Sequence, residues 1–141
     1  MNIILSIKPK WAKLIYDGCK KFEWRKSRPK DLDITVFIYE TAPVKKITGY
    51  FHYNEIYTLN TINKEFSHLD PVVNGCVSVE ELIKYRNNKG KLYAWGIRNP
   101  AKLANPITIE DFKLKRPPQS WCYTKRKLTT CKRHFEDKEN T

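Results

Sequence analysis

Runs and alternations of hydrophobic residues predict a series of short strands along the chain. Residues 2–7 (NIILSI) form a continuous apolar run, which is typical of a buried strand. Residues 20–26 (KKFEWRK) place apolar side chains at every second position, which predicts a half-buried strand. Residues 34–40 and 46–57 are rich in β-branched and aromatic side chains, so we expect two further strands there.

Capping residues predict two helices between these strands. Pro9 suits the first turn of a helix, because its missing N–H would have no partner there, and Gly18 is a natural residue for the end of that helix. Ser78 and Glu81 have the spacing of a capping box, which predicts that a helix begins there and continues over 79–87.

The remaining pattern completes an α+β fold class. Residues 61–69 are expected to be helical and 91–98 to form another strand. Long aromatic strands favour a mixed or antiparallel sheet, and we expect a small mixed β-barrel with flanking helices. The length of 141 residues suits one domain, placed at 1–127, with a basic-to-acidic tail at 128–141 that is expected to fray.

Charge is concentrated in two parts of a chain with a net charge of +12. Residues 8–30 hold nine basic and two acidic residues, and residues 113–135 hold eight basic and no acidic ones, whereas 31–112 has nine against ten. A concentrated positive field attracts polyanions, so nucleic acid is the leading class of partner. The alternative is a charge excess that only keeps the protein in solution.

Several other classes are disfavoured. No stretch approaches the roughly 18 consecutive apolar residues of a membrane span, and no basic segment precedes the first apolar run, so a cytoplasmic protein without a membrane partner is expected. No glycine-rich phosphate loop is present, and no cofactor is expected.

Cysteine spacing does not indicate a metal site. The four cysteines are far apart and form no CxxC motif, which also argues against a disulfide framework. Cys131 and His134 are three residues apart and Cys122 is near in sequence, but a zinc site needs a fourth ligand. No metal is therefore expected.

Two motifs resemble a known family. Residues 18–25 (GCKKFEWR) read G-x-K-x-x-E-x-R after a strand and helix, and the chain closes with LYAWGIRNPAKL, ITIEDF and RPPQSWCY. Together with IYETAPVKKITGYF between them, these segments resemble the ASCH domain family of the PUA-like β-barrel superfamily, over about residues 3–123. The resemblance implies a PUA-like barrel with a cleft beside the motif, suited to RNA or a nucleotide.

The motif has a chemistry of its own. Glu23 and Arg25 are two residues apart and point the same way along a strand, where Arg25 can hold a phosphate or a base edge with two hydrogen bonds. Strict alternation places Lys20 on the opposite face, although its position at a turn can relax that rule. If Lys20 joins the pair, burial beside an arginine lowers its pKa, as a catalytic base requires. The alternative is a salt bridge that fastens the helix end to the strand.

Aromatic and basic residues are mixed near the end of the chain. Single-stranded nucleic acid uses that mixture, because bases stack on rings and phosphates meet cations. The alternative is that the aromatic rings only cover the core. The candidate nucleic-acid-binding residues of both segments are Lys20, Lys21, Glu23, Arg25, Lys26, Arg28, Arg116, Trp121, Tyr123, Lys125, Arg126 and Lys127.

Three hypotheses follow for function. The first is an RNA-binding module, in which the two basic stretches meet around one groove. The second is a hydrolase acting on RNA or a modified nucleoside, with Lys20 as base and Glu23 as its polar partner. The family that the chain resembles includes ribonucleases and N-acetylcytidine amidohydrolases, but Glu23 stands where the amidohydrolases have a threonine. The third is an adaptor that binds an acidic protein. The sequence does not predict an oligomeric state.

Overall fold

A computed structural model describes residues 1–128. Its strands are β1 (Asn2–Ile7), β2 (Phe22–Arg25), β3 (Ile34–Glu40), β4 (Lys46–Tyr53), β5 (Ile56–Leu59), β6 (Leu92–Gly96), β7 (Arg98–Ile107) and β8 (Trp121–Thr124). Its helices are α1 (Pro9–Tyr16), α2 (Asp70–Val73) and α3 (Val79–Arg86), with short 3₁₀ turns η1 (Lys64–His68) and η2 (Glu110–Phe112).

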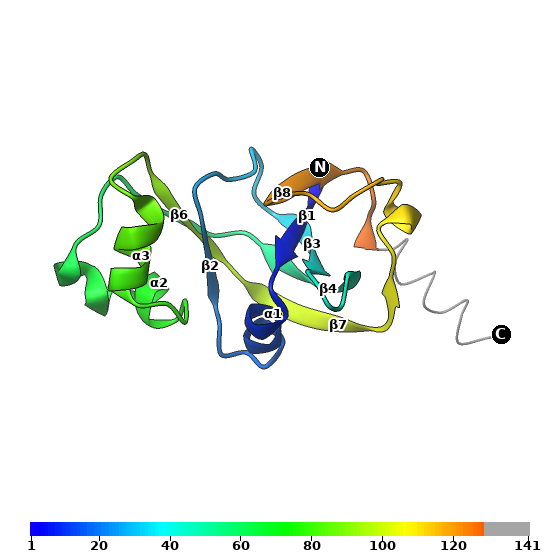
Figure 1. The fold of residues 1–141 in the computed structure, drawn as a ribbon, viewed down its shortest axis with the longest axis horizontal. Coiled ribbons are helices and arrows are strands. Elements are labelled where there is room, and N and C mark those ends of the chain that lie inside the picture. Colours follow the sequence, from blue (N-terminus) through cyan, green and yellow to red (C-terminus); the bar gives the residue numbers. More distant parts are fainter. Residues whose placement is uncertain (129–141) are drawn as a thin grey trace.

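The strands form two sheets. The larger sheet has the order β7-β4-β3-β1-β8, and the smaller has the order β2-β6-β5. β1 and β3 pair in parallel, with Ile3 opposite Val36, and the connection between them contains α1 and β2. Every other pair of neighbouring strands is antiparallel. Figure 1 shows α2 and α3 at one end of the molecule, beside β2 and β6, with β1, β3 and β8 toward the other end.

The expected barrel was only partly right, because the fold is α+β but the two sheets do not close into one. β4 ends at Tyr53 and β5 begins at Ile56, so the single strand predicted over 46–57 divides and its two parts enter different sheets. β2 and β8 are edge strands of different sheets. Side chains, described below, connect these two edges.

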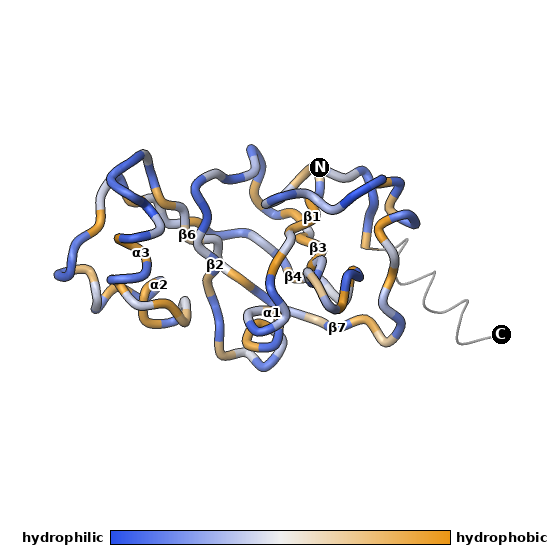
Figure 2. The backbone as a smooth tube through the Cα atoms, viewed as in Figure 1, coloured by the Kyte–Doolittle hydropathy of each residue, from blue (hydrophilic) through white to orange (hydrophobic). Residues whose placement is uncertain are grey.

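Three clusters of buried side chains fill the molecule. Ile3, Leu5 and Trp95 belong to the cluster shared by α1 and both sheets, and Ile4 points to the opposite face of β1, toward Phe112 of η2. A third cluster lies between the smaller sheet and the helices, and it includes Phe22, Trp24, Val72, Leu82 and Leu92. Hydrophobic positions concentrate in the strands, whereas peripheral loops are mostly hydrophilic (Figure 2). The helices α2 and α3 thereby cover one face of the smaller sheet.

Several predicted elements are confirmed. The strands over 2–7 and 34–40 are present, Pro9 opens α1, and the capping box before α3 forms both of its hydrogen bonds. The segment 61–69 contains only the 3₁₀ turn η1 rather than a regular helix. β7 and β8 were not predicted. β7 contains two prolines, which edge strands tolerate because one side of their backbone has no partner.

Candidate functional site

The turn after α1 brings Lys20 into the interior. Gly18 adopts a φ of +81°, a left-handed conformation that favours glycine, and the backbone N–H of Lys20 donates to the Leu14 carbonyl at 3.0 Å. This tight turn suspends the alternation of the following strand, so the Lys20 side chain lies on the same side as Glu23. Lys20 is 1% exposed, and its Nζ lies 3.6 Å from Glu23 Oε1 and donates to the Gly75 carbonyl.

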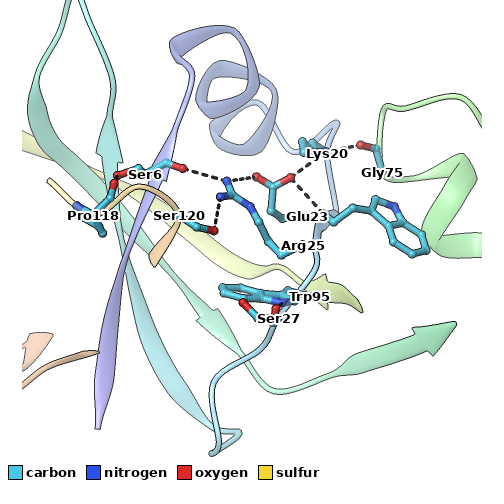
Figure 3. A network of polar contacts seen from close by, with 10 residues as sticks. Ser6, Lys20, Glu23, Arg25, Ser27, Gly75, Trp95, Pro118 and Ser120 are labelled. Carbon is cyan, nitrogen blue, oxygen red and sulfur yellow. Dashed lines mark hydrogen bonds and ion pairs between the residues drawn. The ribbon is translucent and has the colours of Figure 1, made fainter. Parts of the chain in front are cut away.

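Glu23 and Arg25 form the centre of a polar network. Glu23 Oε2 lies 3.0 Å from Nη2 of Arg25, and Glu23 Oε1 accepts a hydrogen bond from the backbone N–H of Trp24 at 3.2 Å. Arg25 also donates from Nη2 to the Ser6 carbonyl at 2.9 Å and from Nη1 to Ser120 Oγ at 3.0 Å. Figure 3 shows Arg25 between Glu23 on one side and Ser6 and Ser120 on the other. The network therefore joins β2, β1 and the segment before β8.

Two cations share one carboxylate in this buried network. Burial is the main reason that the pKa of Lys20 is lowered, and the positive charge of Arg25 lowers it further. The negative charge of Glu23 opposes both effects by favouring the ammonium form. The Lys20 amine is thus more readily neutral than that of an exposed lysine. The three side chains converge, although strict strand alternation predicts Lys20 on the opposite face.

A pocket of about 470 Å³ opens beside the network. Lys20, Glu23 and Arg25 line it, and further walls come from the end of β1, from α1 and from α3. Trp11 and Tyr85 contribute aromatic rings to the lining. Lys20 Nζ lies 5.2 Å from the centroid of the Trp11 ring, so this wall of the pocket is both aromatic and cationic. Lys10 Nζ, outside the lining, lies 4.6 Å from the centroid of the same ring.

Tyr85 marks the mouth of the pocket. The residue is 41% exposed, and Lys26 Nζ lies 4.6 Å from the centroid of its ring. Burial of the rest of the side chain raises the pKa of its hydroxyl, so Tyr85 stays protonated well into the alkaline range. The pocket is thus lined by one aromatic side chain from α1 and one from α3, and a lysine lies beside each ring.

The two basic stretches meet at a second set of contacts beside this network. Trp121 donates from Nε1 to Ser27 Oγ at 2.9 Å, and its ring meets Trp95 and Tyr123 edge to face, at 5.9 and 5.3 Å between centroids. The Tyr123 hydroxyl accepts the backbone N–H of Lys30 at 3.0 Å. β8 and the loop after β2 are therefore in direct contact, and the part of the second basic stretch beyond residue 128 lies outside the described residues.

The other predicted binding residues do not line the pocket. The side chains of Lys21, Arg28, Arg116, Lys125 and Lys127 are exposed, and none of them lines the pocket. Arg126 instead donates from Nη2 to the Asp111 carbonyl, and its guanidinium lies 6.0 Å from the centroid of the Phe112 ring. Arg126 thus packs over η2, on the other face of the larger sheet.

Sequence reasoning missed several residues of the lining, among them Trp11 and Tyr85. Neither residue is among the candidates that the sequence indicates. Tyr85 lies three residues after the buried Leu82 on α3, so it extends the apolar face of that helix past the core. An aromatic residue at the open end of such a face is the signal that could have indicated it.

No metal site or membrane helix is found in the described part of the chain. Among residues 1–128, no group of three or more His, Cys, Asp or Glu side chains is placed to hold a metal ion. Cys131 and His134 lie outside the described residues. No helix within residues 1–128 has the length and apolar character needed to cross a bilayer.

The chain belongs to the ASCH domain family, whose model matches residues 5–113. An ASCH domain-containing ribonuclease of Zymomonas mobilis is 28% identical over 131 residues, covering 89% of this chain and 86% of the relative. The crystal structure of ASCH from Zymomonas mobilis superimposes with a TM-score of 0.77 at 25% identity, covering 94% of each chain. These matches confirm the predicted family and show the same mixed fold.

Larger relatives carry a similar domain. Large ribosomal subunit protein uL22 of Ureaplasma parvum is 26% identical over 127 residues, which are 88% of this chain and 39% of that protein. ATP synthase subunit alpha of the same species is 26% identical over 126 residues, which are 88% of this chain and 15% of the relative. The chain therefore spans about two fifths of one and less than a sixth of the other.

Proposed function

We propose that the chain, through a single ASCH domain over residues 1–127, binds single-stranded RNA and takes one nucleotide into the pocket beside Lys20, Glu23 and Arg25. The observation that carries this proposal is the composition of the pocket. Its lining combines three aromatic side chains, a half-buried arginine and a buried lysine in about 470 Å³. Small-molecule sites of about 300–1,000 Å³ with a few convergent polar groups are typical of proteins.

Each part of the pocket has a role in this proposal. The Tyr85 and Trp11 rings offer surfaces on which a base stacks, an interaction worth about 1–3 kcal/mol per base. The ammonium groups of Lys10 and Lys26 beside these rings attract the flanking phosphates. Trp121 and Tyr123, in contact with the loop after β2, offer a further stacking surface for a neighbouring base.

The comparisons support an RNA partner in general terms. One relative is named a ribonuclease and another a ribosomal protein. A third is named a subunit of ATP synthase, so the names of the larger relatives do not by themselves assign a partner to this domain. The proposal therefore rests on the pocket, with the names as background.

Fluorescence anisotropy with a labelled single-stranded RNA tests the proposal. We expect Tyr85→Ala to weaken binding about 5- to 150-fold, which corresponds to the loss of about 1–3 kcal/mol of stacking. The matched control is Tyr57→Ala, because Tyr57 is 39% exposed and does not line the pocket. Equal loss in both variants, or no loss in Tyr85→Ala, would contradict the proposal.

Cleavage of the bound RNA is a second candidate function, favoured by the buried amine of Lys20 and its lowered pKa. In this candidate the neutral amine takes the proton of a ribose 2′-hydroxyl, whose oxygen attacks the adjacent phosphorus while the 5′-oxygen of the next nucleotide leaves. The resulting ammonium remains paired with Glu23 and the Gly75 carbonyl.

Lys20→Met separates cleavage from binding. It removes the proton acceptor but keeps most of the side-chain volume, so we expect cleavage to be lost while RNA is still bound. Product that forms at the same rate with Lys20→Met would identify a contaminating nuclease and refute this role of Lys20. A control digestion with Lys13→Met, which changes an exposed lysine of α1, should match the wild type.

A further inference from the structure

Two cysteines are in contact where the turn after α1 meets the loop between α2 and α3. The backbone N–H of Lys21 donates to the Asn74 carbonyl at 2.7 Å, and the Cys76 thiol donates to the Cys19 carbonyl at 3.5 Å. Counting outward from the first contact in an antiparallel sense places Cys19 opposite Cys76. The sulfur of Cys76 thus already reaches the backbone of the residue that carries the other thiol.

Both thiols are accessible, and the contact between their segments is fixed by neighbouring residues. Cys19 is exposed and Cys76 is half-buried. Gly75 is required at the contact, because a Cβ there would lie 2.9 Å from Trp24 Nε1 and still closer to the Pro71 carbonyl. A disulfide requires Cα atoms within about 7 Å of each other, and the contact of the Cys76 sulfur with the Cys19 carbonyl brings the two residues together.

We propose that Cys19 and Cys76 are a dithiol site that forms a reversible intrachain disulfide with a low-molecular-weight disulfide as oxidant. The exposed Cys19 thiolate attacks one sulfur of the oxidant, forming a mixed disulfide and releasing one small thiol. The Cys76 thiolate then attacks the Cys19 sulfur and expels the second small thiol. Both cysteines are oxidised, and the small disulfide is reduced to two thiols.

The link would join two walls of the pocket. Lys20 follows Cys19 and Val77 follows Cys76, and both of these neighbours line the pocket. The Lys20 amine donates to the carbonyl of Gly75, the residue before Cys76. A disulfide at this point would hold the two segments together and keep the amine in its buried place. We therefore expect an amine-modifying reagent to label Lys20 severalfold more slowly in the oxidised protein than in the reduced protein.

The test uses the full chain with Cys122→Ser and Cys131→Ser, so that only the proposed pair remains. After incubation with oxidised glutathione and alkylation of free thiols, we expect a monomer lighter by two hydrogen atoms. We also expect a peptide that links residues 19 and 76, and reversal of the link by dithiothreitol. Adding Cys19→Ser or Cys76→Ser to this background should give a stable glutathione adduct instead, with circular dichroism as the check on folding.

Two results would overturn the inference. One is a persistent glutathione adduct, or unreacted thiols, in the protein that keeps both cysteines. The other is a disulfide between two copies of the chain. Labelling of Lys20 at the same rate in both redox states, with the exposed Lys13 as internal reference, would refute the proposed effect on the pocket even if the link forms. None of these readouts depends on RNA binding.

Discussion

Replacing Glu23 with glutamine tests the buried charge network most sharply. The substitution keeps the size of the side chain but removes the only negative charge among the three motif side chains that converge there. Glu23 is 7% exposed and Lys20 is 1% exposed, so water screens the remaining cations poorly. We expect the variant to fold but to be less stable than the wild type.

The size of the loss follows from the geometry. Lys20 Nζ and Glu23 Oε1 are 3.6 Å apart. At an effective dielectric constant of about 20, opposite unit charges at this distance attract each other by about 4–5 kcal/mol, before the cost of desolvation. Removing one partner of a buried pair typically costs about 3–5 kcal/mol, because the other charge stays buried without compensation. The single oxygen of the glutamine amide can accept either the Trp24 N–H or the bond from Arg25 but not both, because the amide nitrogen is a donor. One of the two bonds is kept, so we expect the lower end of that range, about 3 kcal/mol.

Urea denaturation followed by tryptophan fluorescence measures this loss. The free energy of unfolding falls by about 1.5–2 kcal/mol for each 1 M increase in urea, so the midpoint urea concentration should fall by about 1.5–2 M. Without the charge of Glu23 the pKa of Lys20 is lowered further, so the loss should shrink as the pH rises and the amine becomes neutral. Glu80→Gln, which changes an exposed residue of α3, is the matched control. A midpoint equal to that of the wild type, at every pH, would refute the reasoning.

Three more predictions concern the same network. The pKa of Lys20 in the folded state lies below its usual 10.5. The free energy of unfolding of the wild type, relative to that of Lys20→Met, should therefore be lowest at pH values below the folded-state pKa and should rise with pH up to about 10.5. A difference that does not change with pH would contradict this. Gly75→Ala should cost about 1–3 kcal/mol in urea denaturation because its Cβ would overlap Trp24, and an unchanged midpoint would show that the loop gives way. Ser120→Ala should cost about 1 kcal/mol by the same measurement, since Arg25 loses one bond but remains partly in contact with solvent; a loss above about 3 kcal/mol would indicate a larger role for Ser120.

Local patterns predicted the central strands and the first helix because those elements follow from neighbouring residues. The apolar run 2–7 is buried on both faces of β1, and the turn at Gly18 ends α1 as its backbone freedom suggests. Closure of the sheets was not predictable in the same way, because it depends on which strand edges pair. The chain leaves one sheet at Tyr53 and enters the other at Ile56, within a segment that reads as one strand.

The site was predictable in part for the same reason. The motif indicated Glu23 and Arg25 together, and their spacing along β2 places them as expected. The position of Lys20 required the structure, since it depends on a turn that departs from strand alternation. The pocket wall formed by α3 was missed because Tyr85 is 60 residues further along the chain than Arg25, so only the tertiary fold brings them to one cavity.

The most direct measurement of the central claim is a crystal structure of the chain with a short single-stranded RNA. We expect one base in the pocket, in contact with the rings of Trp11 or Tyr85, with its sugar and phosphate near Lys26. An RNA bound along β7, or over η2 at Arg126, with the pocket free of any nucleotide, would contradict it.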